Sequence, residues 1–103
     1  MKRVYIAGPI TGHDDYEQKF EEAAEDLKRC GLTPVNPCAP AGRTYKWYID
    51  RGLNLLKDCD AIYLLPGWGS SKGTRLEYTY ALTVGMPIII IEDGEWVEID
   101  LEA

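Results

Sequence analysis

Short apolar runs alternate with helix-like segments along this 103-residue chain, and this alternation constrains the fold more than any other feature. The apolar runs predict strands at residues 4–7, 32–35, 61–65 and 88–91, and a short edge strand at 95–101. Pro34 favours an edge position for the strand at 32–35 as well. Between them lie segments with apolar residues at helical spacing, and their helices are expected to begin near residues 14, 45 and 74. The first helix has two candidate capping boxes, Asp14-x-x-Glu17 and Asp15-x-x-Gln18. Strands that alternate with helices in this way favour a parallel sheet with helices on both faces.

The length and charge of the chain limit what this sheet can support. A chain of 103 residues holds one modest core, so we expect a single domain over residues 1–103. The predicted architecture is a small Rossmann-like (flavodoxin-like) three-layer α/β sandwich with a four- to five-stranded, mostly parallel sheet. Lys and Arg number 11 against 17 Asp and Glu, which gives a net charge of −6. This acidity argues against a nucleic-acid polymer or a membrane surface as a partner.

The cysteine and histidine content argues against a metal centre and a disulfide framework. Three cysteines are widely spaced, without a C-x-x-C pair, and the single histidine is His13. Zinc sites and disulfide scaffolds need denser sets of these residues, so we expect no metal, no cofactor and a reduced, cytoplasmic protein. The apolar stretch that ends at Gly8 is too short for a signal peptide or a membrane span.

Ligands of parallel α/β sheets bind beyond the carboxyl ends of the strands, which selects the loops at 8–14, 36–44 and 66–73. The last of these loops holds three glycines, two serines and a lysine within residues 67–74, between a strand and a helix. Backbone N–H groups beside such glycines, together with the helix dipole, can hold a phosphate. A flexible strand-to-helix turn explains the same composition, and the glycine spacing matches neither a P-loop nor a dinucleotide fingerprint.

Two acids and a tyrosine near these loops are candidates for chemistry. Glu77 is expected in the first turn of the third helix, where a carboxylate can reach a ligand in the glycine-rich loop, although the helix dipole alone also favours an acid there. Asp50 falls within the second helix and Tyr5 within the first strand. Taken alone, Asp50 fits an exposed helix residue, Tyr5 fits a core residue, and His13 fits an exposed loop residue.

Three ordered motifs connect these residues. The first is Tyr5-Ile6-Ala7-Gly8-Pro9-Ile10-Thr11-Gly12, and the second is Cys59-Asp60-Ala61 at the start of the central strand. The third is Ser71-x-Gly73-Thr74-x-x-Glu77-x-x-x-Ala81-x-x-x-Gly85-x-Pro87. With these motifs, residues 3–92 resemble the nucleoside 2-deoxyribosyltransferase superfamily, which includes the nucleotide N-glycosidases. Within that superfamily the chain is most similar to the small, phage-associated branch.

The resemblance implies catalytic roles for Glu77, Asp50 and Tyr5. Glu77 would attack the anomeric carbon of the sugar, because a carboxylate can capture or stabilise an oxocarbenium-like centre. Asp50 would hold a sugar hydroxyl or protonate the leaving base, and Tyr5 would orient Glu77 by a hydrogen bond. The substrate-binding residues implied by the same motifs are Gly8, Pro9, Ile10, Thr11, Ser71, Gly73 and Thr74, and the glycine-rich loop adds Gly69.

The resemblance also bears on the substrate, through Ser71. Enzymes of this superfamily that act on free nucleosides usually carry an aspartate at this position, whereas the monophosphate hydrolases carry a serine that can donate to a 5′-phosphate. A nucleoside 5′-monophosphate is therefore the implied ligand. The hydrolases often have an arginine at the position of Thr11, so Lys72, Arg75 or Arg43 would have to supply that cation.

The resulting hypothesis is an enzyme that cleaves or transfers at the N-glycosidic bond of a (deoxy)nucleoside 5′-monophosphate, with Glu77 as nucleophile. The alternative is a non-catalytic module that binds or sequesters a nucleotide with the same Gly/Ser loop. A dinucleotide-binding fragment, with Asp93 as its ribose-binding acid, fits less well because the glycine spacing is wrong. Superfamily members form homodimers or higher homo-oligomers, and we expect the same here because a core this small cannot bury all of Trp47, Tyr48, Tyr78 and Tyr80.

Overall fold

Five strands form one sheet in the part of the chain that the computed structural model describes, residues 2–10, 14–39, 41–92 and 94–99. The strands are β1 (Arg3–Ala7), β2 (Thr33–Val35), β3 (Ala61–Leu64), β4 (Ile88–Glu92) and β5 (Glu95–Ile99). The helices are α1 (Tyr16–Arg29), α2 (Tyr45–Lys57) and α3 (Lys72–Val84), and a short 3-10 turn, η1 (Trp68–Ser70), precedes α3.

The strand order is β2-β1-β3-β4-β5, and the first four of these strands run parallel. β5 pairs antiparallel with β4 at one edge, and β2, which contains Pro34, forms the other edge as predicted. The chain leaves β1 for β2 on one side and returns to β3 on the other side. Ligands of doubly wound sheets bind at such a reversal, here at the carboxyl ends of β1 and β3.

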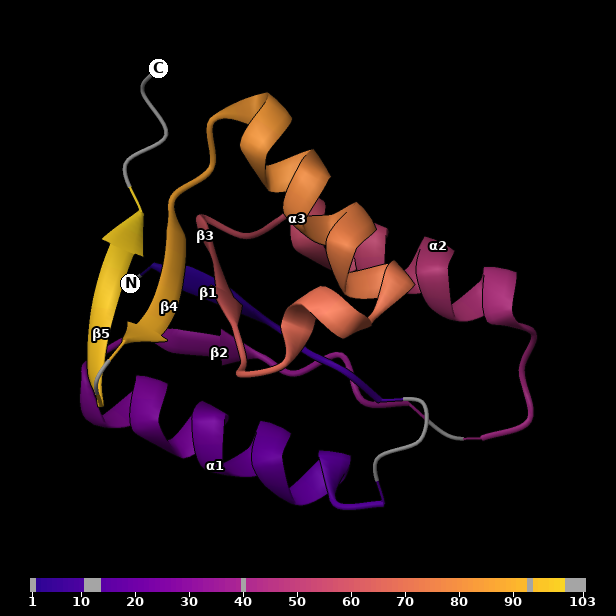
Figure 1. Cartoon of the computed structure of the whole chain (residues 1–103), viewed down its shortest axis with the longest axis horizontal. Coiled ribbons are helices and arrows are strands. Elements are labelled where there is room, and N and C mark those ends of the chain that lie inside the picture. The colour runs from indigo at the N-terminus through magenta and orange to yellow at the C-terminus, as the bar shows by residue number, and fades with distance from the viewer. Residues whose placement is uncertain (1, 11–13, 40, 93, 100–103) are drawn as a thin grey trace.

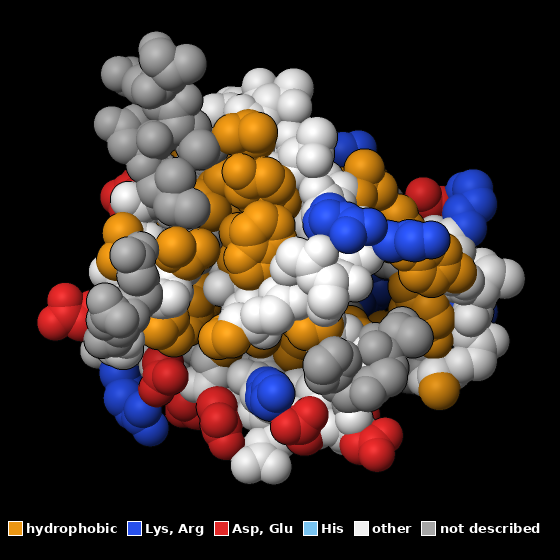
Figure 2. Space-filling model, viewed as in Figure 1, with side chains coloured by type: hydrophobic (Ala, Val, Ile, Leu, Met, Phe, Trp, Pro, Cys, Tyr) orange, Lys and Arg blue, Asp and Glu red, His pale blue; other side chains and the backbone are white. Residues whose placement is uncertain are grey.

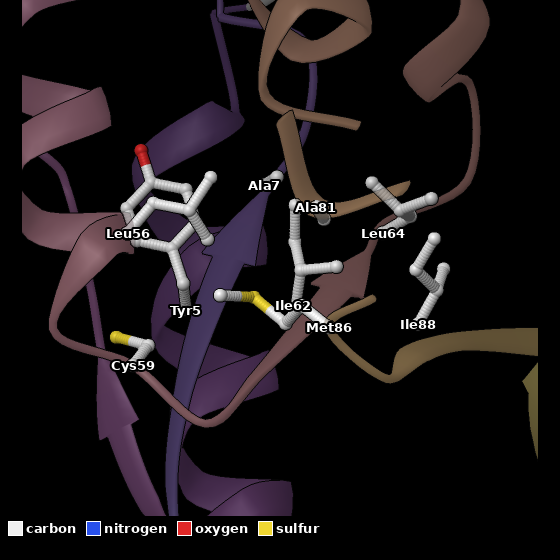
Figure 3. Close-up of a cluster of buried hydrophobic side chains, with 9 residues drawn as sticks. All are labelled: Tyr5, Ala7, Leu56, Cys59, Ile62, Leu64, Ala81, Met86 and Ile88. Atoms are coloured by element: carbon white, nitrogen blue, oxygen red, sulfur yellow. The ribbon is translucent and has the colours of Figure 1, made fainter. Parts of the chain in front are cut away.

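Helices cover both faces of the sheet, which confirms the predicted α/β sandwich. Figure 1 shows α1 on one face and α2 with α3 on the other. Side chains alternate along β1, so Val4 and Ile6 belong to the buried cluster beneath α1, whereas Tyr5 and Ala7 belong to the cluster beneath α2 and α3. Figure 3 shows this second cluster, with the Tyr5 hydroxyl pointing away from the other labelled side chains. The alternation thus places Tyr5 on the same side of the sheet as α3.

Two helix starts differ from the predictions. Asp15 occupies the N-cap position of α1, but its side chain makes no capping hydrogen bond and pairs with Lys19 at 3.4 Å. Neither predicted capping box is therefore formed: Asp14 lies before the N-cap position, and Asp15 makes no capping hydrogen bond. α3 begins at Lys72, two residues earlier than predicted, because the Ser71 hydroxyl caps it and accepts a hydrogen bond from the Thr74 N–H at 3.3 Å. Glu77 consequently lies in the second turn of α3, whereas the first turn was predicted.

The acidic charge gathers over α1. Figure 2 shows Asp and Glu side chains along the lower edge, where α1 lies in Figure 1. Arg29 pairs there with Asp26 at 2.7 Å, and Lys28 pairs with Glu25 at 3.5 Å. These pairs are exposed, so each contributes little to stability. Among the described residues, no helix combines the length and the apolar character needed to cross a membrane.

Candidate active site

A cavity of about 700 Å³ lies beyond the carboxyl ends of β1 and β3. Its wall includes Gly8, Pro9 and Ile10 after β1, Pro37 after β2, and residues 70–74 after β3. All three loops selected from the sequence therefore contribute to it. One further side is formed by α2, and the volume is in the range of a small-molecule site.

Glu77 and Tyr5 meet at this cavity, although 72 positions separate them in the sequence. The Tyr5 hydroxyl donates a hydrogen bond to Glu77 Oε2 at 2.5 Å. Tyr5 is 1% exposed, because its ring packs in the core cluster beneath α2 and α3. The sheet thus fixes the donor, and the donor fixes one carboxylate oxygen of Glu77.

Burial controls the protonation of this pair. It raises the pKa of Glu77 to about 7, and the hydrogen bond from Tyr5 offsets part of the rise. Burial and the neighbouring Glu77 charge together raise the pKa of Tyr5 far above its ordinary value. Tyr5 is therefore a neutral donor at every physiological pH. Glu77 exchanges its proton near neutrality, which suits a carboxyl group in a reaction at an electrophilic carbon.

The start of α3 forms the side of the cavity that follows β3. Ser71, Lys72, Gly73 and Thr74 all line it, and the first N–H groups of a helix have no acceptor within the helix. Thr74 is 2% exposed, and its hydroxyl donates a hydrogen bond to the Gly8 carbonyl oxygen at 3.1 Å. The Thr74 side chain therefore ties α3 to the loop after β1, while Ser71 keeps the proton of its own hydroxyl as a donor.

Two predicted site residues, Asp50 and Gly69, do not join this arrangement. Asp50 is not part of the cavity wall, exposes 54% of its side chain and pairs with Lys46 at 2.5 Å. Asp50 comes directly after Ile49, which lines the cavity, so the rotation of the helix between the two positions turns Asp50 toward solvent. Gly69 also lies outside the wall, and its carbonyl oxygen accepts a hydrogen bond from Arg75 at 3.1 Å. Thr11 lies outside the described residues, as do His13 and Asp93.

Arg51 is a cavity residue that the sequence motifs did not identify. Its Nη1 donates to the Pro37 carbonyl oxygen at 2.5 Å, and its guanidinium lies 5.9 Å from the centre of the Trp47 ring. Of the three cations considered from the sequence, Lys72 lines the cavity, whereas Arg43 lies over Trp47 at 5.2 Å. The third, Arg75, is the donor to the Gly69 carbonyl. The spacing of Trp47 and Arg51, one helical turn apart, is the one sequence signal for this contact.

Gly52 is the second residue that sequence analysis missed. A Cβ atom at this position would lie 2.5 Å from Glu77 Oε2 and 2.9 Å from the Tyr5 hydroxyl. Gly52 is buried in α2, so the missing side chain is what allows this helix to approach the Tyr5–Glu77 pair. No local pattern in the sequence reports such a contact, because it depends on how α2 and α3 pack.

Comparison with known proteins places the chain in a family. Residues 2–90 match the family model described as "Domain of unknown function (DUF4406)". The chain belongs to this family. A search of the curated proteins finds no match to this DUF4406 chain.

Solved structures share the fold. The 2-deoxyribosyltransferase of Leishmania mexicana matches with a TM-score of 0.71 and 23% identity, over 88% of this chain and 64% of that one. The 2-deoxyribosyltransferase of Bacillus psychrosaccharolyticus matches with a TM-score of 0.65 and 17% identity, over 85% and 70%. The CMP N-glycosidase BcmB of Clostridium botulinum matches with a TM-score of 0.64 and 24% identity, over 86% and 70%. The DUF4406 chain therefore has the 2-deoxyribosyltransferase fold and spans about two thirds of the length of these proteins.

The close contact at Gly52 predicts that even a methyl side chain at this position lowers the stability of the fold. Although alanine is the better helix former, Gly52→Ala is expected to destabilise this DUF4406 chain by about 1–3 kcal/mol, since the new methyl group must displace Glu77 or Tyr5. Urea unfolding measures the difference. The matched control is Gly69→Ala, because a Cβ there meets nothing within 4 Å. Equal stability of Gly52→Ala and the wild type would contradict the close approach of α2.

Proposed function

We propose that this DUF4406 chain is an enzyme that cleaves or transfers at the N-glycosidic bond of a (deoxy)nucleoside 5′-monophosphate. The observation that carries the proposal is the part-buried Tyr5–Glu77 hydrogen bond at a cavity whose wall includes the start of α3. Glu77 is the nucleophile. One of its oxygens forms a bond to C1′ as the C1′–N bond breaks, and the electron pair of that bond leaves with the base. Water or a second base then attacks C1′ and releases the Glu77 carboxylate.

Tyr5 and burial both favour this role for Glu77. The hydrogen bond at Oε2 holds the carboxylate in one orientation and leaves Oε1 for the attack on C1′. A pKa of about 7 gives the carboxylate a substantial population at neutral pH and keeps it a stronger base than an exposed glutamate. The loop at Gly8, Pro9 and Ile10 supplies the ribose-side wall in this proposal.

The start of α3 suits the 5′-phosphate. Helix N-terminal N–H groups and the helix dipole attract anions, and Lys72 adds a positive charge at the same place. The Ser71 hydroxyl donates the remaining hydrogen bond in this proposal, with Gly73 allowing close approach of the backbone. The matching fold of two 2-deoxyribosyltransferases and a CMP N-glycosidase supports glycosidic-bond chemistry at this site.

A substrate panel tests the proposal. The purified chain is incubated with nucleosides and their 5′-monophosphates, in the deoxy and the ribo series, and free base is followed by chromatography. We expect base release from at least one monophosphate, little release from the matching nucleoside, and none with Glu77→Ala. Absence of release from every substrate, or equal release by Glu77→Ala, would overturn the proposal.

A non-catalytic nucleotide-binding module is the second candidate. It is favoured by the outward position of Asp50, because the acid implied for protonation of the base is absent from the described cavity wall. Calorimetry with a 5′-monophosphate, followed by chromatography of the recovered ligand, separates the two candidates. The module requires measurable binding and an intact ligand after hours of incubation.

Ser71 offers a matched test of phosphate recognition. Ser71→Asp keeps an N-cap acceptor for the Thr74 N–H but introduces a negative charge at the phosphate site. We expect its affinity for the monophosphate to fall by about 10- to 100-fold at moderate salt, with stability close to that of the wild type. Binding is measured by calorimetry and stability by urea unfolding. Unchanged monophosphate affinity would show that the phosphate lies elsewhere.

The oligomeric state, the phage-associated branch and the cellular location of the protein stay predictions. Trp47, Tyr48, Tyr78 and Tyr80 are all half-buried in the chain, which is the observation that supports a homodimer or higher homo-oligomer. Light scattering measures the assembly directly. Membership of the phage-associated branch and a cytoplasmic location rest on the sequence resemblance and composition alone.

A further inference from the structure

We propose that Arg51 binds the base of the nucleotide and takes up the negative charge that develops on it, which selects a pyrimidine base, above all uracil or thymine. The inference rests on the proposed function and deepens it. It assigns the leaving-group side of the cavity and the class of base, neither of which follows from Glu77 and the Gly/Ser loop.

The position of Arg51 is the first argument. Among the described residues, the charged side chains in the cavity wall are Glu77, Lys72 and Arg51. Lys72 lies at the start of α3, after β3. Arg51 instead donates a hydrogen bond to the carbonyl oxygen of Pro37, after β2. β2 and β3 flank β1 on opposite sides, so their ends are roughly 10 Å apart at the usual strand spacing.

This separation matches the shape of a nucleoside monophosphate. Its phosphate and its base leave opposite sides of the sugar, and Tyr5, which orients Glu77, lies on the central strand β1. If the phosphate sits at the start of α3 and C1′ meets Glu77, the base extends toward the β2 side. Arg51 is then the cation that the base reaches.

The geometry of Arg51 is fixed from two directions. The Pro37 carbonyl oxygen accepts from Nη1 at 2.5 Å, and the ring of Trp47 lies beside the guanidinium at 5.9 Å. A guanidinium carries five N–H donors in one plane, so a single bond to Pro37 orients the group without using its capacity. The positive charge also acts on Tyr5. It lowers the pKa of Tyr5, whereas burial and Glu77 raise it. Arg51 is therefore within electrostatic reach of the reacting centre.

The charge balance of the reaction then selects the base. When the C1′–N1 bond breaks, uracil or thymine keeps the electron pair as an anion spread over N1 and its carbonyl oxygens. Arg51 stabilises that anion by donating hydrogen bonds to O2, next to N1, and water supplies the proton after departure. A purine leaves most readily once an acid has protonated N7. The described wall offers no carboxyl group besides Glu77, and a guanidinium does not release its proton.

Binding in a Glu77→Gln background tests the placement while the ligand stays intact. The ligands are dUMP and 1,2-dideoxyribose 5-phosphate, which has the same sugar phosphate with hydrogen in place of the base. We expect Arg51→Met to lower the affinity for dUMP at least tenfold and to change the affinity for the abasic ligand less than twofold. Arg51→Lys, which keeps the charge, is expected to restore part of the dUMP affinity. An equal loss for both ligands would place Arg51 at the phosphate and overturn the inference.

Leaving-group dependence tests the role in catalysis. The logarithm of kcat/KM is measured against the pKa of the departing base for dUMP and its 5-fluoro, 5-bromo and 5-methyl derivatives. Arg51→Met is expected to lose about 100-fold or more with the most basic leaving group and clearly less with 5-fluorouracil. A uniform loss across the series, or wild-type preference for dAMP, would overturn the role. If the wild type releases no base, the proposed function fails, and the binding comparison still decides whether Arg51 contacts the base.

Discussion

Glu77→Gln is expected to lower the rate of base release by at least about a thousandfold, because the amide cannot form the bond to C1′. Glutamine has the size of glutamate and offers an oxygen to the Tyr5 hydroxyl, so the hydrogen bond at 2.5 Å keeps an acceptor. Binding of the monophosphate should change little, since the phosphate is held at the start of α3 in the proposed complex. Single-turnover rates with excess enzyme isolate the chemical step from product release.

The control for this comparison is Asp50→Asn. Asp50 is exposed, paired with Lys46 and outside the cavity wall, so we expect less than a twofold change in rate. The wild-type kcat/KM should also rise with pH, with a midpoint near 7, as Glu77 loses its proton. A loss with Asp50→Asn as large as that with Glu77→Gln would return Asp50 to the site and contradict its outward position.

Glu77→Gln is also expected to stabilise the protein, by an amount that depends on pH. The folded chain holds the Glu77 proton more tightly than the unfolded chain, because burial raises the pKa from 4.5 to about 7. The stability that this protonated group contributes is fully present below pH 4.5 and is lost as pH rises through 7. Above that range the wild type keeps a buried charge that costs up to about 3 kcal/mol, whereas glutamine carries no charge.

Urea unfolding at pH 4, 6 and 8 measures this effect. Glu77→Gln should match the wild type at pH 4 and exceed it by about 2–3 kcal/mol at pH 8, with the gap opening between these values. Asp50→Asn serves again as the reference, since Asp50 is exposed and lies outside the cavity wall. A constant difference between Glu77→Gln and the wild type at all three pH values would mean that burial does not control the protonation of Glu77.

The sheet could be predicted because it depends on short-range patterns, whereas the hydrogen bond between Tyr5 and Glu77, 72 positions apart, was implied only by the family resemblance. Apolar runs fix the strands, the alternation along β1 fixes the face of Tyr5, and the ordered motif from Ser71 to Glu77 fixes a loop followed by a helix. The predicted start of α3 is two residues late, because the Ser71 hydroxyl caps the helix as well as being a candidate ligand donor.

The face that α2 presents to the cavity could not be predicted in the same way. Its rotation decides that Ile49, Arg51 and Gly52 line the cavity and that Asp50 does not. Neighbouring positions on a helix differ by about 100°, so a motif that is correct in sequence can still assign the wrong neighbour. The contacts that settle the rotation come from Pro37, Tyr5 and the side chain of Glu77, and these are distant in sequence.

The close approach of α2 at Gly52 limits which acids can lie beside Glu77. A Cβ atom at Gly52 would lie 2.5 Å from Glu77 Oε2, so a carboxyl-bearing side chain at this position would have to displace Glu77 or Tyr5. In the described cavity wall Glu77 is the one carboxyl group. The activity should therefore rise to a plateau with pH, without the bell shape of an acid–base pair.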